Sequence, residues 1–128
     1  MVDQRPSQSV RRAVIIDDEP AFVVMLTKML QSLGFEVKVS TDPRSSQTYE
    51  IRDSDVVFVD SLMPHVSGLE VLEQLARQGT KANIVAMSGN PQSLDRAESL
   101  AKKLDLNLVG VLEKPFRLDD LKFILDDL

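Results

Sequence analysis

The chain has 128 residues, which suits one domain that hides about two-thirds of its unfolded surface in a single core. Hydrophobic residues make up 43% of the sequence and charged residues 27%, which excludes a disordered composition. The absence of cysteine excludes disulfides and thiolate metal sites, and a net charge of −5 opposes binding to nucleic acid. No apolar run is long enough for a membrane span or a signal peptide, so we expect a cytoplasmic protein without membrane contact.

The first strand of the pattern ends in two acidic residues. Residues 1–12 are polar and predict a flexible tail, so we expect one domain over residues 13–128. Within that domain the apolar run 13–17 predicts a buried strand. It terminates in the carboxylate pair Asp17 and Asp18.

A helix, a strand and a second helix are expected next. Pro20 suits the first turn of a helix, and apolar residues at helical spacing continue that helix as far as Gly34. Apolar and polar residues alternate over 35–40, which predicts a half-exposed strand. We expect a second helix over 42–51, although its serine and threonine residues are poor helix formers.

The central strand, residues 56–60 (VVFVD), is apolar until it stops at one carboxylate, Asp60. Pro64 predicts a loop between this acid and the next helix, because proline disfavours helix in the residue before it. Ser67 followed three residues later by Glu70 is a capping-box pattern that predicts the start of that helix.

Two strands and two helices complete the pattern. Residues 82–87 predict a strand that leads to Ser88, and the Asn-Pro pair after it predicts the start of a helix. Residues 108–112 predict a strand just before Lys114, and 118–128 predict an amphipathic helix. Five strands alternating with five helices predict an α/β fold with a doubly wound, five-stranded parallel sheet.

Parallel strands place their carboxyl ends along one edge of a sheet, where ligands bind. This edge gathers the polar residues that follow four of the strands: Asp17, Asp18, Asp60, Ser88 and Lys114. Three carboxylates repel one another unless a cation joins them, and Mg²⁺ prefers such oxygen ligands. A carboxylate nucleophile at Asp60, with Mg²⁺, Lys114 and Ser88 neutralising charge, suits phosphoryl transfer, and no Gly-rich nucleotide loop is present.

The segments IIDDEP, VDSLMPHVSG, MSGN and LEKPF resemble, in this order, the four signatures of response-regulator receiver domains of two-component signalling. The resemblance implies a flavodoxin-like fold with strand order 2-1-3-4-5. It implies Mg²⁺-dependent phosphorylation of Asp60 by the phosphohistidine of a sensor histidine kinase or a histidine phosphotransfer protein. It further implies a signalling protein, not a turnover enzyme, that acts on an output domain or protein partner and can form a homodimer.

The resemblance also implies a role for each site residue. The metal ligands would be Asp17, through bound water, with Asp18, Asp60 and the backbone carbonyl of Leu62. Lys114 would hold one phosphoryl oxygen, with a cis bond to Pro115, and Ser88 would hold another and shift on phosphorylation.

Two positions depart from what many receivers have. Val111 stands three residues before the lysine, where an aromatic residue commonly reports phosphorylation. We therefore expect the signal to leave through Ser88 and the helix after it, or through dimerisation. Leu62 stands two residues after the phosphoacceptor, and an apolar side chain there cannot position a hydrolytic water. We therefore expect slow self-dephosphorylation.

Other classes of protein share parts of this pattern. A small aspartate-nucleophile phosphatase would place Asp-x-Asp after the first strand, where this chain has Asp-Asp-Glu. A binding module that has lost phosphorylation would not need Asp60 and Lys114, which are both present. Residues 94–116 resemble receivers fused to cyclic-dinucleotide phosphodiesterase domains, by general likeness and not by a motif.

Overall fold

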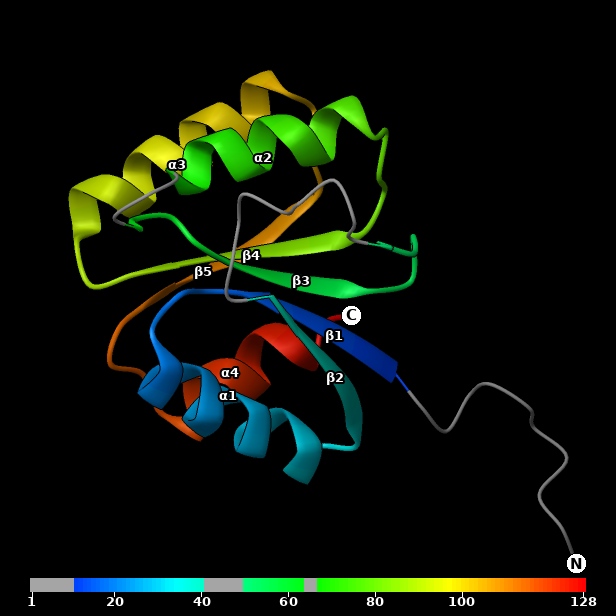
Figure 1. The fold of residues 1–128 in the computed structure, drawn as a ribbon, viewed down its shortest axis with the longest axis vertical. Coiled ribbons are helices and arrows are strands. Elements are labelled where there is room, and N and C mark those ends of the chain that lie inside the picture. The colour runs from blue at the N-terminus through cyan, green and yellow to red at the C-terminus, as the bar shows by residue number, and fades with distance from the viewer. Residues whose placement is uncertain (1–10, 41–49, 64–66) are drawn as a thin grey trace, which may run out of the picture.

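The computed structural model describes residues 11–40, 50–63 and 67–128 (Figure 1). The strands are β1 (Arg11–Ile16), β2 (Phe35–Ser40), β3 (Val56–Asp60), β4 (Asn83–Ser88) and β5 (Leu108–Glu113). The helices are α1 (Pro20–Ser32), α2 (Gly68–Arg77), α3 (Pro91–Lys103) and α4 (Leu118–Leu125). None of the helices in these ranges has the length and apolar character needed to span a bilayer.

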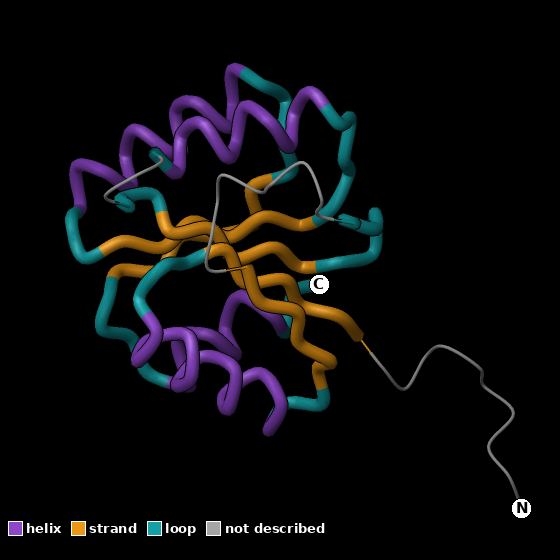
Figure 2. The backbone as a smooth tube through the Cα atoms, viewed as in Figure 1, coloured by secondary structure: helices purple, strands orange, loops and turns teal. Residues whose placement is uncertain are grey.

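All pairings in the sheet are parallel, and the strand order is β2-β1-β3-β4-β5. Helices α1 and α4 cover one face of the sheet, and α2 and α3 cover the other (Figures 1 and 2). The doubly wound sheet and its order are therefore confirmed.

The number of helices differs from the expected five, because the described residues form four. Most of the helix expected over 42–51 falls in 41–49, which lies outside the described residues. Residues 50 and 51, where the description resumes, are not helical. The prediction was wrong for these last two residues, whose neighbours in the sequence are poor helix formers.

The start of β1 also differs from the expected boundary, since the strand begins at Arg11 and not at residue 13. The guanidinium of Arg12 donates to both carboxylate oxygens of Asp55, over 3.0 and 2.7 Å. Arg12 is 9% exposed and Asp55 is fully buried. The predicted tail was therefore wrong for Arg11 and Arg12, which belong to β1. Arg12 can be buried in the sheet because Asp55 is its buried ion partner.

The core consists of two apolar layers, one on each face of the sheet. Successive side chains of a strand point to opposite faces. Val56 and Phe58 of β3 accordingly pack with α1 and α4, whereas Val57 and Val59 pack with α2 and α3. The unbroken apolar run that predicted this strand therefore reflects burial on both faces.

Two helix starts are fixed next to strand ends. Ser67 caps α2 by accepting a hydrogen bond from Leu69 N, and Asn90 caps α3 through its side chain. At Gly68 a Cβ atom would lie 2.3 Å from the carbonyl oxygen of Asp60, so only glycine allows α2 to start this close to β3.

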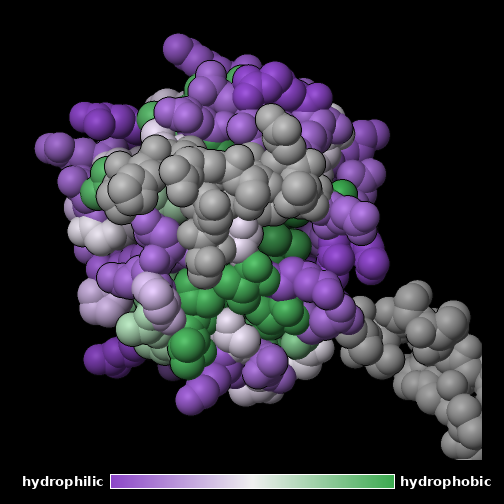
Figure 3. All heavy atoms as spheres, in the orientation of Figure 1, coloured by the Kyte–Doolittle hydropathy of each residue, from purple (hydrophilic) through white to green (hydrophobic). Residues whose placement is uncertain are grey.

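The surface is uneven in polarity. Hydrophobic side chains gather in front of α1 and β2, whereas α2 and α3 present a hydrophilic surface (Figure 3). Val24 of α1 and Val39 of β2 are exposed.

Candidate functional site

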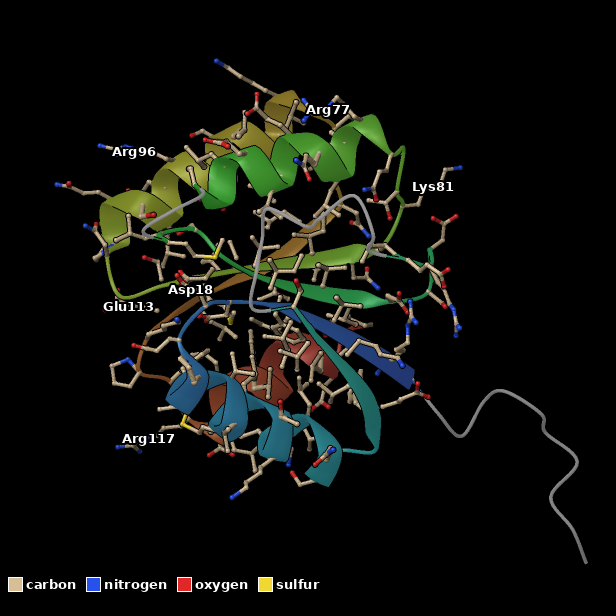
Figure 4. All side chains as sticks on the ribbon, viewed as in Figure 1. Asp18, Arg77, Lys81, Arg96, Glu113 and Arg117 are labelled. Carbon is tan, nitrogen blue, oxygen red and sulfur yellow. The ribbon has the colours of Figure 1, made fainter. Side chains whose placement is uncertain are left out.

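Polar residues converge where the strands reach their carboxyl ends. Asp18, two residues after β1, and Glu113, the last residue of β5, lie at the same end of the sheet in Figure 4. An open cavity of about 520 Å³ lies at this edge. It is lined by residues from four segments of the chain: Asp18, Glu19, Phe22, Asp60, Leu62, Ser88, Gly89, Lys114 and Pro115.

Three carboxylates form the acidic part of the site. One oxygen from each of Asp17, Asp18 and Asp60 lies within 4.8 Å of the other two. Asp17 is fully buried, and its Oδ1 accepts a hydrogen bond from the backbone N–H of Glu19 over 2.9 Å. Asp60 is 5% exposed and forms part of the cavity wall. The three oxygens are close enough to bind one cation.

Lys114 supplies the positive charge opposite these acids. Its Nζ lies 2.8 Å from Asp17 Oδ2, 3.3 Å from Asp60 Oδ2 and 3.8 Å from Glu19 Oε1. It also lies 4.0 Å from the centroid of the Phe22 ring. Burial opposes the charged form, but the hydrogen bond to Asp17 and the charge of Asp60 outweigh it and raise the pKa of Lys114. The ammonium therefore stays charged at neutral pH.

Burial raises the pKa of Asp60, whereas burial alone would lower that of Lys114. Loss of solvent raises the pKa of Asp60 to about 6, and the negative charge of Asp17 adds to the rise. The backbone N–H of Leu62, which donates to Asp60 Oδ1 over 3.1 Å, and the charge of Lys114 lower it in part. Asp60 is thus a carboxylate that a bound cation would stabilise.

Ser88 connects the cavity to α3. Its Oγ accepts a hydrogen bond from Asn90 N over 3.0 Å, and its carbonyl oxygen accepts one from Lys114 N over 2.8 Å. Asn90 in turn caps α3 by accepting from the backbone N–H groups of Gln92 and Ser93. A movement of the Ser88 hydroxyl would therefore disturb the cap of this helix.

A second connection to α3 was not predicted from the sequence. Ser61, next to Asp60, donates through Oγ to the carbonyl oxygen of Met87 over 3.2 Å. The same Oγ lies 2.7 Å from Ser93 Oγ, so Ser93 supplies the hydrogen of that bond. Both serines are buried. The sequence offered no signal for this pair, because the burial that makes each hydroxyl require a partner is visible only in the folded protein.

The structure brings together the side chains that the sequence placed at one edge: Asp17, Asp18, Asp60, Ser88 and Lys114. The roles assigned to them stay predictions. The Lys114-Pro115 bond is cis, as expected. Leu62 lies at the cavity with 60% of its surface exposed, and Val111 is 38% exposed. The sequence interpretation missed Phe22 and Glu19, which line the cavity beside Lys114.

Curated proteins similar to this chain include transcriptional regulators. The Alkaline phosphatase synthesis transcriptional regulatory protein SphR of Synechococcus elongatus is 30% identical over 115 residues, which cover 82% of this chain and 43% of SphR. Transcription factor SKN7 of Candida albicans is 31% identical over 113 residues, 88% of this chain and 20% of SKN7. The chain thus spans less than half the length of these two relatives. Neither name mentions a phosphodiesterase, so that likeness stays a prediction.

Solved structures and a family model agree on the fold and the family. A response regulator from Colwellia psychrerythraea superposes with a TM-score of 0.81 at 28% identity, over 91% of this chain and 94% of that one. The receiver domain from Methylobacillus flagellatus gives 0.76 at 28% identity, over 93% and 98%. The family model described as "Response regulator receiver domain" matches residues 13–126. The chain therefore belongs to the receiver domain family of two-component response regulators.

Proposed function

We propose that Asp60 is the phosphoacceptor of this receiver domain. The observation that carries the proposal is the position of Lys114, whose Nζ lies 3.3 Å from Asp60 Oδ2 at the wall of an open cavity. The donor would be the phosphohistidine of a sensor histidine kinase or a histidine phosphotransfer protein. An oxygen of Asp60 forms a bond to phosphorus while the phosphorus–nitrogen bond breaks, and the imidazole keeps that electron pair and takes up a proton.

The carboxylates at this edge suit a hard divalent cation, because they offer three closely spaced oxygens. Asp18, Asp60 and the backbone carbonyl of Leu62 would hold Mg²⁺, and Asp17 would act through bound water. Bound there, Mg²⁺ would neutralise charge on the transferring phosphoryl oxygens. The structure of TrrA from Thermotoga maritima, which has the same fold at 23% identity, is a complex with Mg(2+)-BeF.

Lys114 and Ser88 would each hold a phosphoryl oxygen. The Ser88 hydroxyl now accepts from Asn90 N, so a turn toward the phosphoryl group would change this bond and the cap of α3. We infer that the signal leaves through this helix, because Val111 offers no aromatic side chain. On phosphorylation, amide NMR signals of residues 90–104 are expected to shift, and unchanged signals there would refute this route.

Acetyl phosphate labelling tests the phosphoacceptor. The protein is expected to acquire an acid-stable, hydroxylamine-sensitive phosphoryl group only with Mg²⁺, and Asp60→Asn is expected to abolish labelling. Asp119→Asn is the matched control, because Asp119 is an exposed acid at the start of α4. Labelling that persists in Asp60→Asn, or that needs no Mg²⁺, would overturn the assignment.

The same assay separates the alternatives. A phosphatase would release phosphate from a phosphoester with turnover, using an acid after β1 as nucleophile. Asp17 opposes this, because it is fully buried and both its oxygens already accept hydrogen bonds. A phosphorylation-independent binding module would show no labelling. If the chain acts as a receiver, it also requires an output domain or a protein partner that responds to phosphorylation. The greater length of the two curated relatives is in line with this.

A further inference from the structure

We propose that Phe22 is a positioning residue for phosphoryl transfer, whose ring face holds the ammonium of Lys114 at the cavity wall. The inference rests on the proposed roles of Asp60 and Lys114. Phe22 lies in the first turn of α1, is 8% exposed and lines the cavity. The Nζ of Lys114 stands 4.0 Å from its ring centroid. That distance lies well within the range of a cation–π contact.

The ring is itself held in place. Phe116 meets it edge to face, with centroids 5.5 Å apart and planes at 78°. Phe116 is 7% exposed and follows Lys114 by two residues. The loop that carries the lysine therefore also carries the aromatic residue that fixes the ring, so α1 and this loop support the ammonium together.

The contacts of Lys114 differ in kind. Asp17 and Asp60 accept directed hydrogen bonds, over 2.8 and 3.3 Å. The face of an aromatic ring attracts a cation without requiring one direction of an N–H bond, and the attraction grows when water is excluded. The Lys114 side chain is only 14% exposed. The ammonium can therefore turn from Asp60 toward a phosphoryl oxygen while the ring keeps it at the cavity.

Glu19 does not provide the same support, because its carboxylate is 3.8 Å from Nζ and its side chain is 62% exposed. Without the aromatic face, water would occupy that side of the ammonium. Lys114 would then lie less often where charge develops on the phosphoryl oxygens. In this proposal Phe22 thus acts through Lys114, as a positioning residue.

Stepwise fluorination of the ring tests this, because fluorine weakens the negative potential of the ring face with little change in shape. Phenylalanine with one, two or three fluorines is placed at position 22 by amber suppression, and the initial rate of labelling by acetyl phosphate is measured at saturating Mg²⁺. We expect a graded fall of about fivefold for the trifluoro ring, equivalent to about 1 kcal/mol. Phe22→Leu is expected to lose at least as much.

Phe35 is the matched control. It is 6% exposed, belongs to the same apolar layer and has a cation over its ring, with Arg11 at 4.9 Å. The same fluorinated residues at position 35 are expected to leave the labelling rate unchanged. A flat rate across the series at position 22, or an equal fall at position 35, would overturn the proposal.

A second readout does not depend on phosphorylation. The ε-methylene protons of Lys114, identified by their loss in Lys114→Arg, are expected to resonate upfield of ordinary lysine signals because of the Phe22 ring current. In Phe22→Leu they are expected to move back. If the wild-type protein is not labelled at all, the proposed function fails while this signal still reports the contact. Lys114 signals at ordinary positions would overturn the role of Phe22 alone.

Discussion

The pKa of Asp60 is set by opposing influences on one buried carboxylate. The N–H of Leu62 and the ammonium of Lys114 favour the ionised form, yet burial and Asp17 keep the pKa of Asp60 at about 6. This residue therefore binds its proton more tightly in the folded protein than in the unfolded chain. Such a shift makes stability depend on pH.

Without Mg²⁺, the stabilising contribution of this raised pKa is fully present below about pH 4, near the unfolded value, and is lost as pH rises through about 6. Asparagine does not ionise, so Asp60→Asn avoids the cost of burying a negative charge at position 60. At pH 7.5 the variant is therefore expected to be roughly 1–3 kcal/mol more stable than the wild type. The difference is expected to shrink toward pH 4. Urea unfolding in EDTA at several pH values measures it, with Asp119→Asn as control, and a difference that grows on acidification would contradict the pKa.

We expect Leu62 to influence a second property of the same site, the lifetime of the phosphoryl group. Its side chain is largely exposed at the cavity, and its contact with Asp60 is made by the backbone N–H. Leu62→Asn keeps that contact and adds an amide that can position a water. Self-dephosphorylation is expected to become about tenfold faster, measured by phosphate release. Leu62→Met, which stays apolar, is expected to behave as wild type, and equal rates in all three proteins would refute the idea.

Among the elements, β1 depends on an interaction between residues 43 positions apart in the sequence. Arg12 and Asp55 form a buried pair, and Asp55 also accepts from the backbone N–H of Arg52 over 2.7 Å. Asp55→Asn leaves a buried guanidinium without its counter-charge, so a loss of about 3 kcal/mol of folding stability is expected. Arg12→Met on the same background is expected to recover part of it. Arg96→Met is the control, because Arg96 points into solvent from α3 (Figure 4).

The measurement is a double-mutant cycle by urea unfolding. Additive losses from the two substitutions would show that Arg12 and Asp55 do not stabilise each other. We expect instead a coupling free energy between the two substitutions that is well above the deviation from additivity for distant sites, about 0.5 kcal/mol. The reason is that Arg12 and Asp55 are both buried and pair with each other.

The sequence predicted those elements and contacts that depend on residues close together in the chain or on the strand topology. Caps such as Asn90, and the apolar run of β3, are local patterns, and both were predicted. The gathering of Asp17, Asp60 and Lys114 followed from topology, since parallel strands end at one edge.

Contacts between distant residues were not predictable in this way. The partner of Arg12 lies 43 residues further on, so nothing near Arg12 marks it as buried. Ser61 and Ser93 meet across 32 residues, and Lys114 reaches Phe22 only after β5 has joined the sheet and α1 has packed on its face. Each of these depends on the finished tertiary structure, and so does the raised pKa of Asp60.

Over the whole molecule, the parallel sheet concentrates acidic charge at one end, in a protein whose net charge is already −5. A cation bound only by the folded state should therefore raise the stability of the entire domain. At a tenfold excess of Mg²⁺ over its dissociation constant, the expected gain is about 1.4 kcal/mol. Urea unfolding with Mg²⁺ or EDTA measures it, and stability indifferent to Mg²⁺ would exclude the metal site.

Asp60→Asn, compared in Mg²⁺ and in NaCl, separates this effect from a general response to salt. Removing the carboxylate relieves repulsion in EDTA, so the variant starts more stable than the wild type at pH 7.5, but it also removes a metal ligand. Its gain from Mg²⁺ is therefore expected to be smaller, whereas Asp119→Asn keeps the full gain. Screening of the carboxylate repulsion alone would also give the variant a higher stability in EDTA and a smaller gain, so the gain from Mg²⁺ is compared with the gain from NaCl at equal ionic strength. A gain that Mg²⁺ gives and NaCl does not, and that Asp60→Asn reduces, is expected for a cation bound by Asp60, whereas equal gains from the two salts would contradict the metal site.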